Sequence, residues 1–179
     1  MRALLATGQF SLVTVAEQGP SDLLRMVGGS FGSHSHVPFE ADTVAQRNLL
    51  GARIDAAVTQ ADRAVLLVAQ GAACFAAAWW ARLSPSGYVS RVAGALLVAP
   101  VEDGESFASP QVALPFPSML VESSVARLDG RALALGWGSE VVRSPVRRAI
   151  ERFTGAVVES RVRAAESLIS GRPASGIRG

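Results

Sequence analysis

The sequence predicts an α/β fold in which helices cover both faces of a mostly parallel sheet of about five strands. Residues 64–69 and 92–99 are continuously apolar, which is typical of parallel strands buried on both faces. Helical patterns separate most of the strand candidates, and this alternation favours parallel pairing. The chain has 179 residues, of which 49% are hydrophobic, enough for one domain with a full core.

The elements follow one another with recognisable boundaries. Strands are expected at 11–16, 64–69, 92–99, 118–122 and 140–143, and helices at 42–61, 74–83, 128–136 and 146–169. Asp42 or Thr43 can cap the first helix, and Pro145 suits the start of the last. Residues 28–38 and 100–117 have loop compositions. We expect an α/β domain over 1–145, an arginine-rich amphipathic helix over 146–169 and a flexible tail over 170–179.

Charge and hydropathy indicate the compartment and the class of partner. All 17 basic residues are arginine, and residues 143–179 hold eight arginines against three glutamates. Only Phe153 interleaves with these arginines, so an acidic protein surface is favoured over stacked nucleic-acid bases. No apolar run is long enough to span a bilayer, the N-terminus lacks a secretory pattern, and one cysteine fits a reducing compartment. We expect a cytoplasmic protein with no membrane span.

The segment that joins the strand at 64–69 to the helix at 74–83 is the most informative. It reads A-V-L-L-V-A-Q-G-A-A-C-F-A-A-A-W-W: a buried strand, a turn of small residues and an alanine-rich helix. A nucleophile elbow, G-x-S-x-G, has this frame because its strained turn requires small neighbours. Glycine stands here where the nucleophilic serine would lie. The five elbow positions are Ala69, Gln70, Gly71, Ala72 and Ala73.

Three further stretches complete a recognisable pattern. They read V-A-G-A-L-L-V-A-P at 92–100, L-P-F-P-S at 114–118 and A-L-G-W-G-S-E-V-V at 134–142. Together with the elbow frame they resemble the YdeN-type small serine hydrolases, the family that includes retinoblastoma-binding protein nine. The resemblance covers about 54–142 and implies a compact α/β-hydrolase fold. An active chain of this type would be a carboxylic-ester hydrolase.

The three catalytic positions that the resemblance implies are all empty. Gly71 replaces the serine, and V-A-R follows Ser123 and Ser124 where the family has its acid. The stretch S-P-V-R-R at 144–148 stands in place of the histidine loop, and no histidine follows His36. Acyl transfer needs a nucleophile, a base and a group that orients the base, so we expect no catalytic residues.

Other polar residues favour structural roles. Cys74 is expected to be a buried core thiol. His34 and His36 are expected to form an exposed loop pair, since metal ligation would need further ligands. The acidic stretch 102–105 follows a strand end, where α/β proteins bind ligands, but a solvated loop is favoured there. We predict neither a cofactor nor a metal site.

Two candidate binding surfaces remain. Trp79 and Trp80 point about 100° apart on a helix, so at least one is expected at the surface or at a partner, and Trp80 is the candidate. The last helix is expected to pack through an apolar stripe and to present arginines on its other side. The stripe is Val146, Ile150, Phe153, Val157 and Val158. The arginine candidates are Arg147, Arg148 and Arg152.

We therefore expect a catalytically inactive α/β-hydrolase-like protein, a pseudoenzyme, that binds protein partners as an accessory or structural subunit of an assembly. Two alternatives stay open. One is a serine hydrolase with a displaced nucleophile, for which Ser123 and Ser124 are the nearby hydroxyls. The other is a small-ligand binder that uses the retained cleft. Homo-oligomerisation also stays open.

Overall fold

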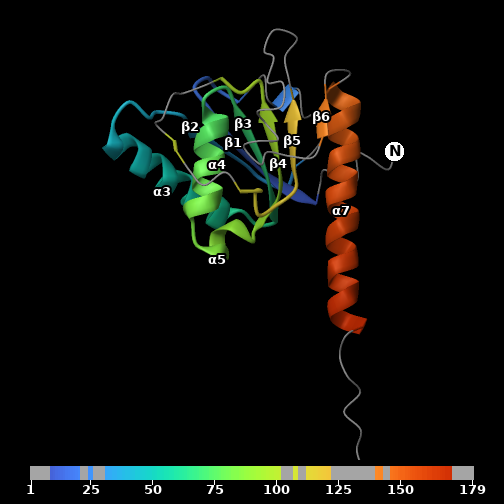
Figure 1. The fold of residues 1–179 in the computed structure, drawn as a ribbon. Helices are drawn as coiled ribbons and strands as arrows, with labels where there is room; N and C mark the ends of the chain where they lie inside the picture. Colours follow the sequence, from blue (N-terminus) through green and yellow to red (C-terminus); the bar gives the residue numbers. More distant parts are fainter. Residues whose placement is uncertain are drawn as a thin grey trace, which may run out of the picture.

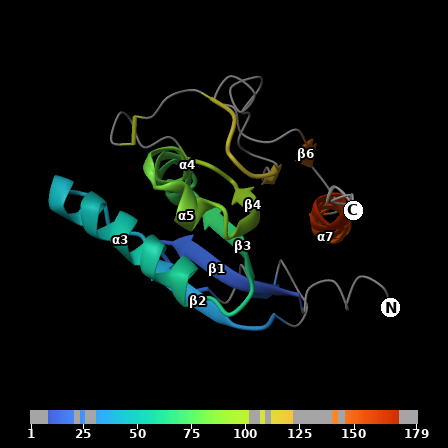
Figure 2. The same cartoon turned by 90° about the horizontal axis from the view of Figure 1, so that it is seen from below.

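The computed structural model describes residues 9–20, 24–25, 31–101, 107–108, 112–121, 140–142 and 146–170. Its elements are β1 (Phe10–Ala16), β2 (His34–Pro38), α3 (Val44–Gln60), β3 (Ala64–Gln70), α4 (Ala73–Leu83), α5 (Ser86–Val89), β4 (Val92–Val98), β5 (Ser118–Val121), β6 (Glu140–Val142) and α7 (Val146–Ser170). They form three layers, with α3 and α4 on one face of the sheet and α7 on the other (Figure 1, Figure 2). The predicted helix at 128–136 and the tail from 171 lie outside the described residues.

The described strands form one six-stranded sheet in the order β2-β1-β3-β4-β5-β6, and every neighbouring pair is parallel. The predicted parallel α/β architecture is confirmed, and so are the five predicted strands. β2 is the sixth, and the loop predicted for 28–38 is wrong over His34–Pro38. Among the described strands, β2 pairs only with β1, and it is largely solvent-accessible, so it lacks the continuous apolar run that marks a central strand.

Each face of the sheet carries its own apolar core. Side chains alternate along the strands, so each strand contributes to both cores. Toward α3 and α4 the largest fully buried residues are Leu50, Ile54, Leu67, Trp80, Leu97 and Leu120. Toward α7 they include Leu12, Leu66, Leu96, Met119, Phe153 and Val157. Helices are therefore required on both sides, because an open face would expose one core to water.

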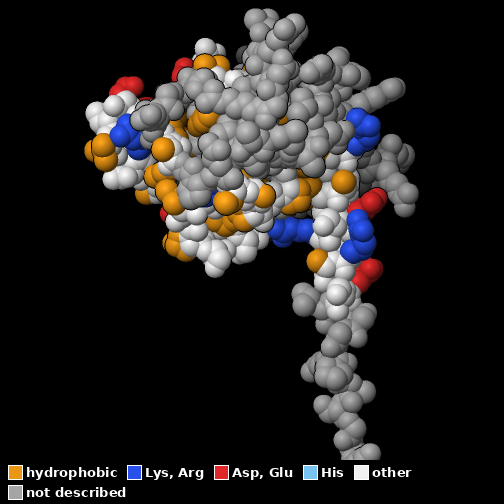
Figure 3. Space-filling view, in the orientation of Figure 1, with side chains coloured by type: hydrophobic (Ala, Val, Ile, Leu, Met, Phe, Trp, Pro, Cys, Tyr) orange, Lys and Arg blue, Asp and Glu red, His pale blue; other side chains and the backbone are white. Residues whose placement is uncertain are grey.

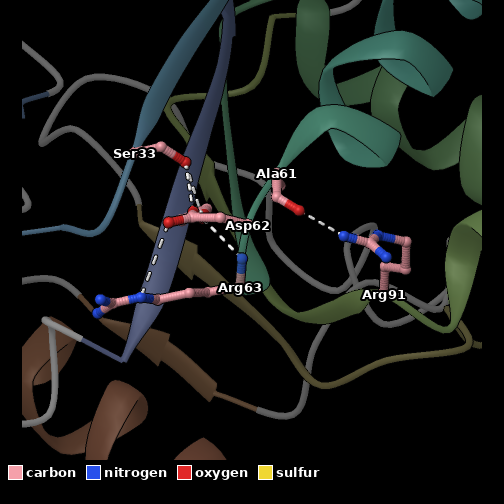
Figure 4. A network of polar contacts seen from close by, with 6 residues as sticks. Ser33, Ala61, Asp62, Arg63 and Arg91 are labelled. Atoms are coloured by element: carbon pink, nitrogen blue, oxygen red, sulfur yellow. Dashed lines mark hydrogen bonds and ion pairs between the residues drawn. The ribbon is translucent and has the colours of Figure 1, made fainter.

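Side-chain hydrogen bonds define both ends of α3. Thr43 caps its amino end in a capping box with Gln46, which settles the choice left between Asp42 and Thr43. At the carboxyl end Arg91 donates to the carbonyl oxygens of Val58, at 3.0 Å, and of Ala61 (Figure 4). An arginine placed there satisfies carbonyl groups that the helix leaves without partners, and its charge suits the negative end of the helix.

A carboxylate joins three strands at the amino-terminal edge of the sheet (Figure 4). Ser11 of β1 and Ser33, just before β2, both donate to Asp62 Oδ1, at 2.6 and 2.8 Å. Asp62 itself lies just before β3. The hydrogen bond from Ser11, followed by that from Ser33, holds the pKa of Asp62 below its ordinary value. This arrangement fixes the register in which the three strands start.

The helix α7 packs on β4 at a glycine. A Cβ atom added at Gly94 would lie 3.1 Å from Phe153 Cζ, 3.2 Å from Val157 Cγ2 and 3.2 Å from the Pro117 carbonyl oxygen. Phe153 and Val157 are buried, which confirms these two members of the predicted stripe. Val158 is half-buried and packs on the same core, whereas the side chains of Val146 and Ile150 lie outside the described residues. Glycine is thus needed where α7 crosses the sheet. No helix of the described chain is long and apolar enough to cross a membrane.

Replacing Gly94 with alanine should lower the free energy of unfolding by about 1–3 kcal/mol, because the new methyl group overpacks the contact with Phe153, Val157 and the Pro117 carbonyl. Urea unfolding followed by circular dichroism measures this change. The matched control is Gly155→Ala on α7, where nothing lies within 4 Å of the added Cβ. Alanine there should raise stability by about 0.5–1 kcal/mol. Equal effects at the two positions would contradict the packing argument.

Candidate functional site

The strand-turn-helix that joins β3 to α4 has the backbone of a nucleophile elbow. Gly71 lies on the turn with φ of +64°. Its N–H donates to the Val98 carbonyl oxygen at 3.0 Å, and its own carbonyl accepts from the Cys74 N–H at 3.2 Å. Apart from its two chain neighbours, no described residue has an atom within 4 Å of the place where a Cβ of Gly71 would stand. The two hydrogen bonds thus fix the backbone at the position of the nucleophile, where there is space for a side chain but glycine provides none.

A cleft of about 330 Å³ lies over this turn at the carboxyl-terminal edge of the sheet. It is lined by Ala16, Glu17, Gln18, Gln70, Gly71, Ala72 and Val101. Parallel α/β proteins bind ligands outside this edge. The backbone N–H groups of Ala72 and Ala73 have no acceptor among the described residues, and the N–H that follows the nucleophile is an oxyanion donor in an elbow. The cleft could therefore receive a polar group without providing a nucleophile.

Residues 17, 18 and 101 were not predicted as lining residues. The signal for them was present, since Glu17 and Gln18 follow β1 and Val101 closely follows β4. The carboxyl ends of parallel neighbours meet at one edge, so a strand prediction also locates the residues that follow each strand. What the sequence could not provide was the order of the strands, which places β1 and β4 on the two sides of β3.

Cys74 is fully buried, as predicted, and belongs to the structure of the elbow. Its thiol donates to the Ala69 carbonyl at 3.3 Å and lies 3.6 Å from that of Val98. Burial raises the pKa of this thiol well above its ordinary value. Nucleophilic attack requires a thiolate, so the environment keeps Cys74 protonated and unreactive.

The two histidines lie on an edge strand and not in the exposed loop that was predicted. Their rings flank the buried hydroxyl of Thr14: His34 Nε2 lies 3.1 Å from Thr14 Oγ1, and His36 Nδ1 lies 2.9 Å from it. Partial burial lowers the pKa of both histidines, and for His36 the neighbouring His34 adds to this effect. In the described part of the chain no third potential ligand joins them in a metal-binding cluster.

This placement separates both histidines from the elbow. β2 is the edge strand, and β1 lies between it and β3, which carries Gly71 at its carboxyl end. Adjacent strands are about 4.8 Å apart, so two strand spacings separate the rings from the turn. A base must come within about 3 Å of the hydroxyl that it activates. The rings are also tied to Thr14, so neither of them serves Gly71.

Trp80 is buried and is not a surface binding residue, contrary to the sequence-based expectation. Its side chain is 1% exposed, and its indole N–H donates to Asp55 Oδ1 of α3 at 2.8 Å. Trp79 is the more accessible member of the pair and packs edge-on against Phe107, with ring centroids 5.7 Å apart. Because Asp55 comes from another helix, the spacing of the two tryptophans along α4 could not show which one is satisfied inside.

The arginine candidates lie in the first turns of α7. Arg152 is exposed, while the side chains of Arg147 and Arg148 lie outside the described residues. Arg161 lies further along α7, and its Nη2 donates to the carbonyls of Ser90 and Val92, both at 3.2 Å. It therefore holds α7 against the start of β4. Residues 102–105, 123 and 124 lie outside the described residues.

Comparison with known proteins gives the family and a near structural relative. The family model described as serine hydrolase matches residues 37–147. No curated protein matches the chain. Among solved structures, a protein assigned as a YdeN-like hydrolase from Pectobacterium atrosepticum aligns with a TM-score of 0.63 and 18% identity. That alignment covers 88% of this chain and 96% of the other.

Two further hydrolases have a similar fold. A hormone-sensitive lipase from a metagenome library aligns with a TM-score of 0.57 and 9% identity, over 86% of this chain and 79% of the other. A bacterial heroin esterase aligns with a TM-score of 0.57 and 13% identity, over 86% of this chain and 75% of the other. At such identities the likeness shows the fold alone, and it confirms the α/β-hydrolase fold predicted from the sequence.

Proposed function

The chain belongs to the serine hydrolase family, and from this premise we propose that it is a catalytically inactive member that acts by binding. The observation that carries the proposal is Gly71, which occupies the elbow turn with φ of +64° and has open space in place of a side chain. A serine hydrolase needs a hydroxyl at this point and a base beside it. Both histidines of the chain lie two strands away.

A protein partner, with this chain as an accessory or structural subunit, is the form of binding that we propose first. The basis is α7, which extends past the lower edge of the sheet (Figure 1). Its side chains are exposed from Glu159 to Ser167. A long helix that projects from its domain offers a surface to another molecule, and arginines suit acidic partners because they pair with carboxylates. We assign the contact to Arg147, Arg148 and Arg152, which lie in the first turns of α7, at the opposite end of the helix from this projecting segment; Arg152 is exposed there.

A second candidate is binding of a small ligand in the cleft over Gly71. The specific observation in its favour is the volume of about 330 Å³ together with the N–H groups of Ala72 and Ala73, which lack acceptors among the described residues. Small-molecule pockets commonly measure ~300–1,000 Å³ and fix their ligands through a few polar groups. The alternative of a displaced nucleophile at Ser123 or Ser124 is separated from both candidates by the labelling experiment below.

The purified protein should not label with a fluorophosphonate probe and should not hydrolyse short p-nitrophenyl esters above background. The reason is that the elbow carries no hydroxyl at Gly71. Labelling is measured by intact-mass spectrometry, with the heat-unfolded protein as the control for non-specific reaction. Stoichiometric labelling of the native protein at any serine would overturn the proposal, and at Ser123 or Ser124 it would establish the displaced nucleophile.

The variant Gly71→Ser should fold and remain inactive. The side chain has room, and the positive φ costs a non-glycine residue about 1–2 kcal/mol, which urea unfolding can measure. The matched control is Gly71→Ala, which carries the same backbone strain without a hydroxyl. We expect both variants to lose the same stability and to hydrolyse esters equally slowly. Esterase activity in the serine variant well above the alanine variant would show that a base reaches the turn.

Replacing Arg147, Arg148 and Arg152 with glutamate should abolish recovery of the partner in affinity purification from cells at native expression. The thermal midpoint should change little, because charge pairs made by exposed side chains such as Arg152 contribute little to folding stability. Moderate salt should also weaken the wild-type complex, because exposed charge pairs are screened. The matched control replaces the same three residues with lysine, which keeps the charge and should retain the partner in part. Unchanged recovery in the glutamate variant would refute the arginine interface.

A further inference from the structure

A second cavity lies at the opposite edge of the sheet from Gly71. It measures about 480 Å³ and opens between the end of α4, α5, the start of β4, the segment 115–117 and α7. This volume falls in the range of ~300–1,000 Å³ that is common for small-molecule sites. The proposed function involves neither this cavity nor the residues that line it.

The walls of the cavity are of two kinds. The apolar part includes Val89, Val92, Phe116, Val157 and Ala164. The polar part consists of Arg161 with the serines Ser84, Ser86, Ser90 and Ser160. Figure 3 shows basic atoms beside hydrophobic side chains in the angle between α7 and the lower side of the domain. The described lining includes one cation and no carboxylate, so a ligand with an apolar body and a negatively charged group fits its chemistry.

Two hydrogen bonds fix the side chain of Arg161, and its remaining N–H groups can still donate to a ligand. Its Nη2 donates to the Ser90 and Val92 carbonyls, which orients the guanidinium at the mouth of the cavity. Its Nε and Nη1 have no acceptor, and its charge has no carboxylate partner, among the described residues. Fixing an arginine through two carbonyl groups reduces the freedom that it loses when it binds an anion. The hydroxyls of Ser84, Ser86 and Ser160 also line the cavity and are further potential donors.

We propose that this cavity binds an aliphatic carboxylate of medium chain length, with the carboxylate on Arg161 and the chain along Val92, Phe116 and Val157. The apolar walls take the hydrocarbon out of water, which favours binding in proportion to the area buried. The guanidinium donates charge-assisted hydrogen bonds to the carboxylate. Neither part suffices alone, because the cavity is open to solvent and its cation is exposed.

Octanoate is the probe, and isothermal titration calorimetry on the full chain is the measurement. Octanoate should bind saturably at one site and raise the thermal midpoint. Octanamide, which has the same chain without the charge, should bind at least about tenfold more weakly, since hydrogen bonds to charged groups contribute that much. Absence of saturable octanoate binding would overturn the proposal. Equal affinities for the two compounds would overturn the role of the cation.

Two substitutions on α7 locate the ligand. Ala164→Trp fills the cavity and should abolish octanoate binding, whereas Ala165→Trp, on the next residue and outside the lining, should leave it unchanged. Unchanged affinity in Ala164→Trp would place the ligand elsewhere.

Two further substitutions test Arg161 itself. Arg161→Met removes the charge and should weaken binding at least about tenfold, and Arg161→Lys should recover part of that loss. Should Ala164→Trp fail to fold, this pair decides the proposal alone, because equal octanoate affinity in the methionine variant and the wild type refutes it.

Discussion

Burial of β3 and β4 on both faces is the constraint on which the rest of this structure depends. Every residue of β4 is buried, and so is β3 from Val65 to Ala69. Such strands need helices on both sides, and right-handed crossovers then make the neighbouring strands parallel. Parallel strands bring their carboxyl ends to one edge. The cleft over Gly71 lies at that edge because β1, β3 and β4 end there together.

The sequence predicted what depends on local pattern and missed what depends on contacts across the chain. The apolar runs of β3 and β4 and the stripe that contains Phe153 and Val157 could be predicted directly because each has a local signature, and the same was true of the cap of α3 to within one residue, Asp42 or Thr43. The strand β2 could not be predicted in this way, because its stability comes from pairing with β1 and its two histidines form their hydrogen bonds with Thr14. The prediction that Trp80 is a surface residue was wrong for the same reason. The acceptor of its indole N–H is Asp55, which lies 25 residues away in the sequence.

The elbow shows that the frame of a catalytic site and its chemistry can be separated physically. In a hydrolase the nucleophile accepts a strained backbone, whereas glycine adopts φ of +64° at little cost. The turn is then held by packing. The Cys74 thiol bonds to the Ala69 carbonyl, and the Gly71 N–H bonds to Val98 of the neighbouring strand. These contacts close the loop between β3 and α4 whether or not a hydroxyl is present, so the shape of the cleft carries no information about turnover.

The helix α7 has a different structural role in each part of its length. Phe153 and Val157 pack over Gly94 and complete the second core, which fixes the middle of the helix on the sheet. One turn further, Arg161 bonds to the start of β4, and from there the helix leaves the domain. Packing thus ends where polar anchoring begins. Arg161 contributes both to the attachment of the helix and to the lower cavity, whereas Ala164 lines the cavity and makes none of the hydrogen bonds that attach α7 to β4, so the two contributions of α7 can be separated.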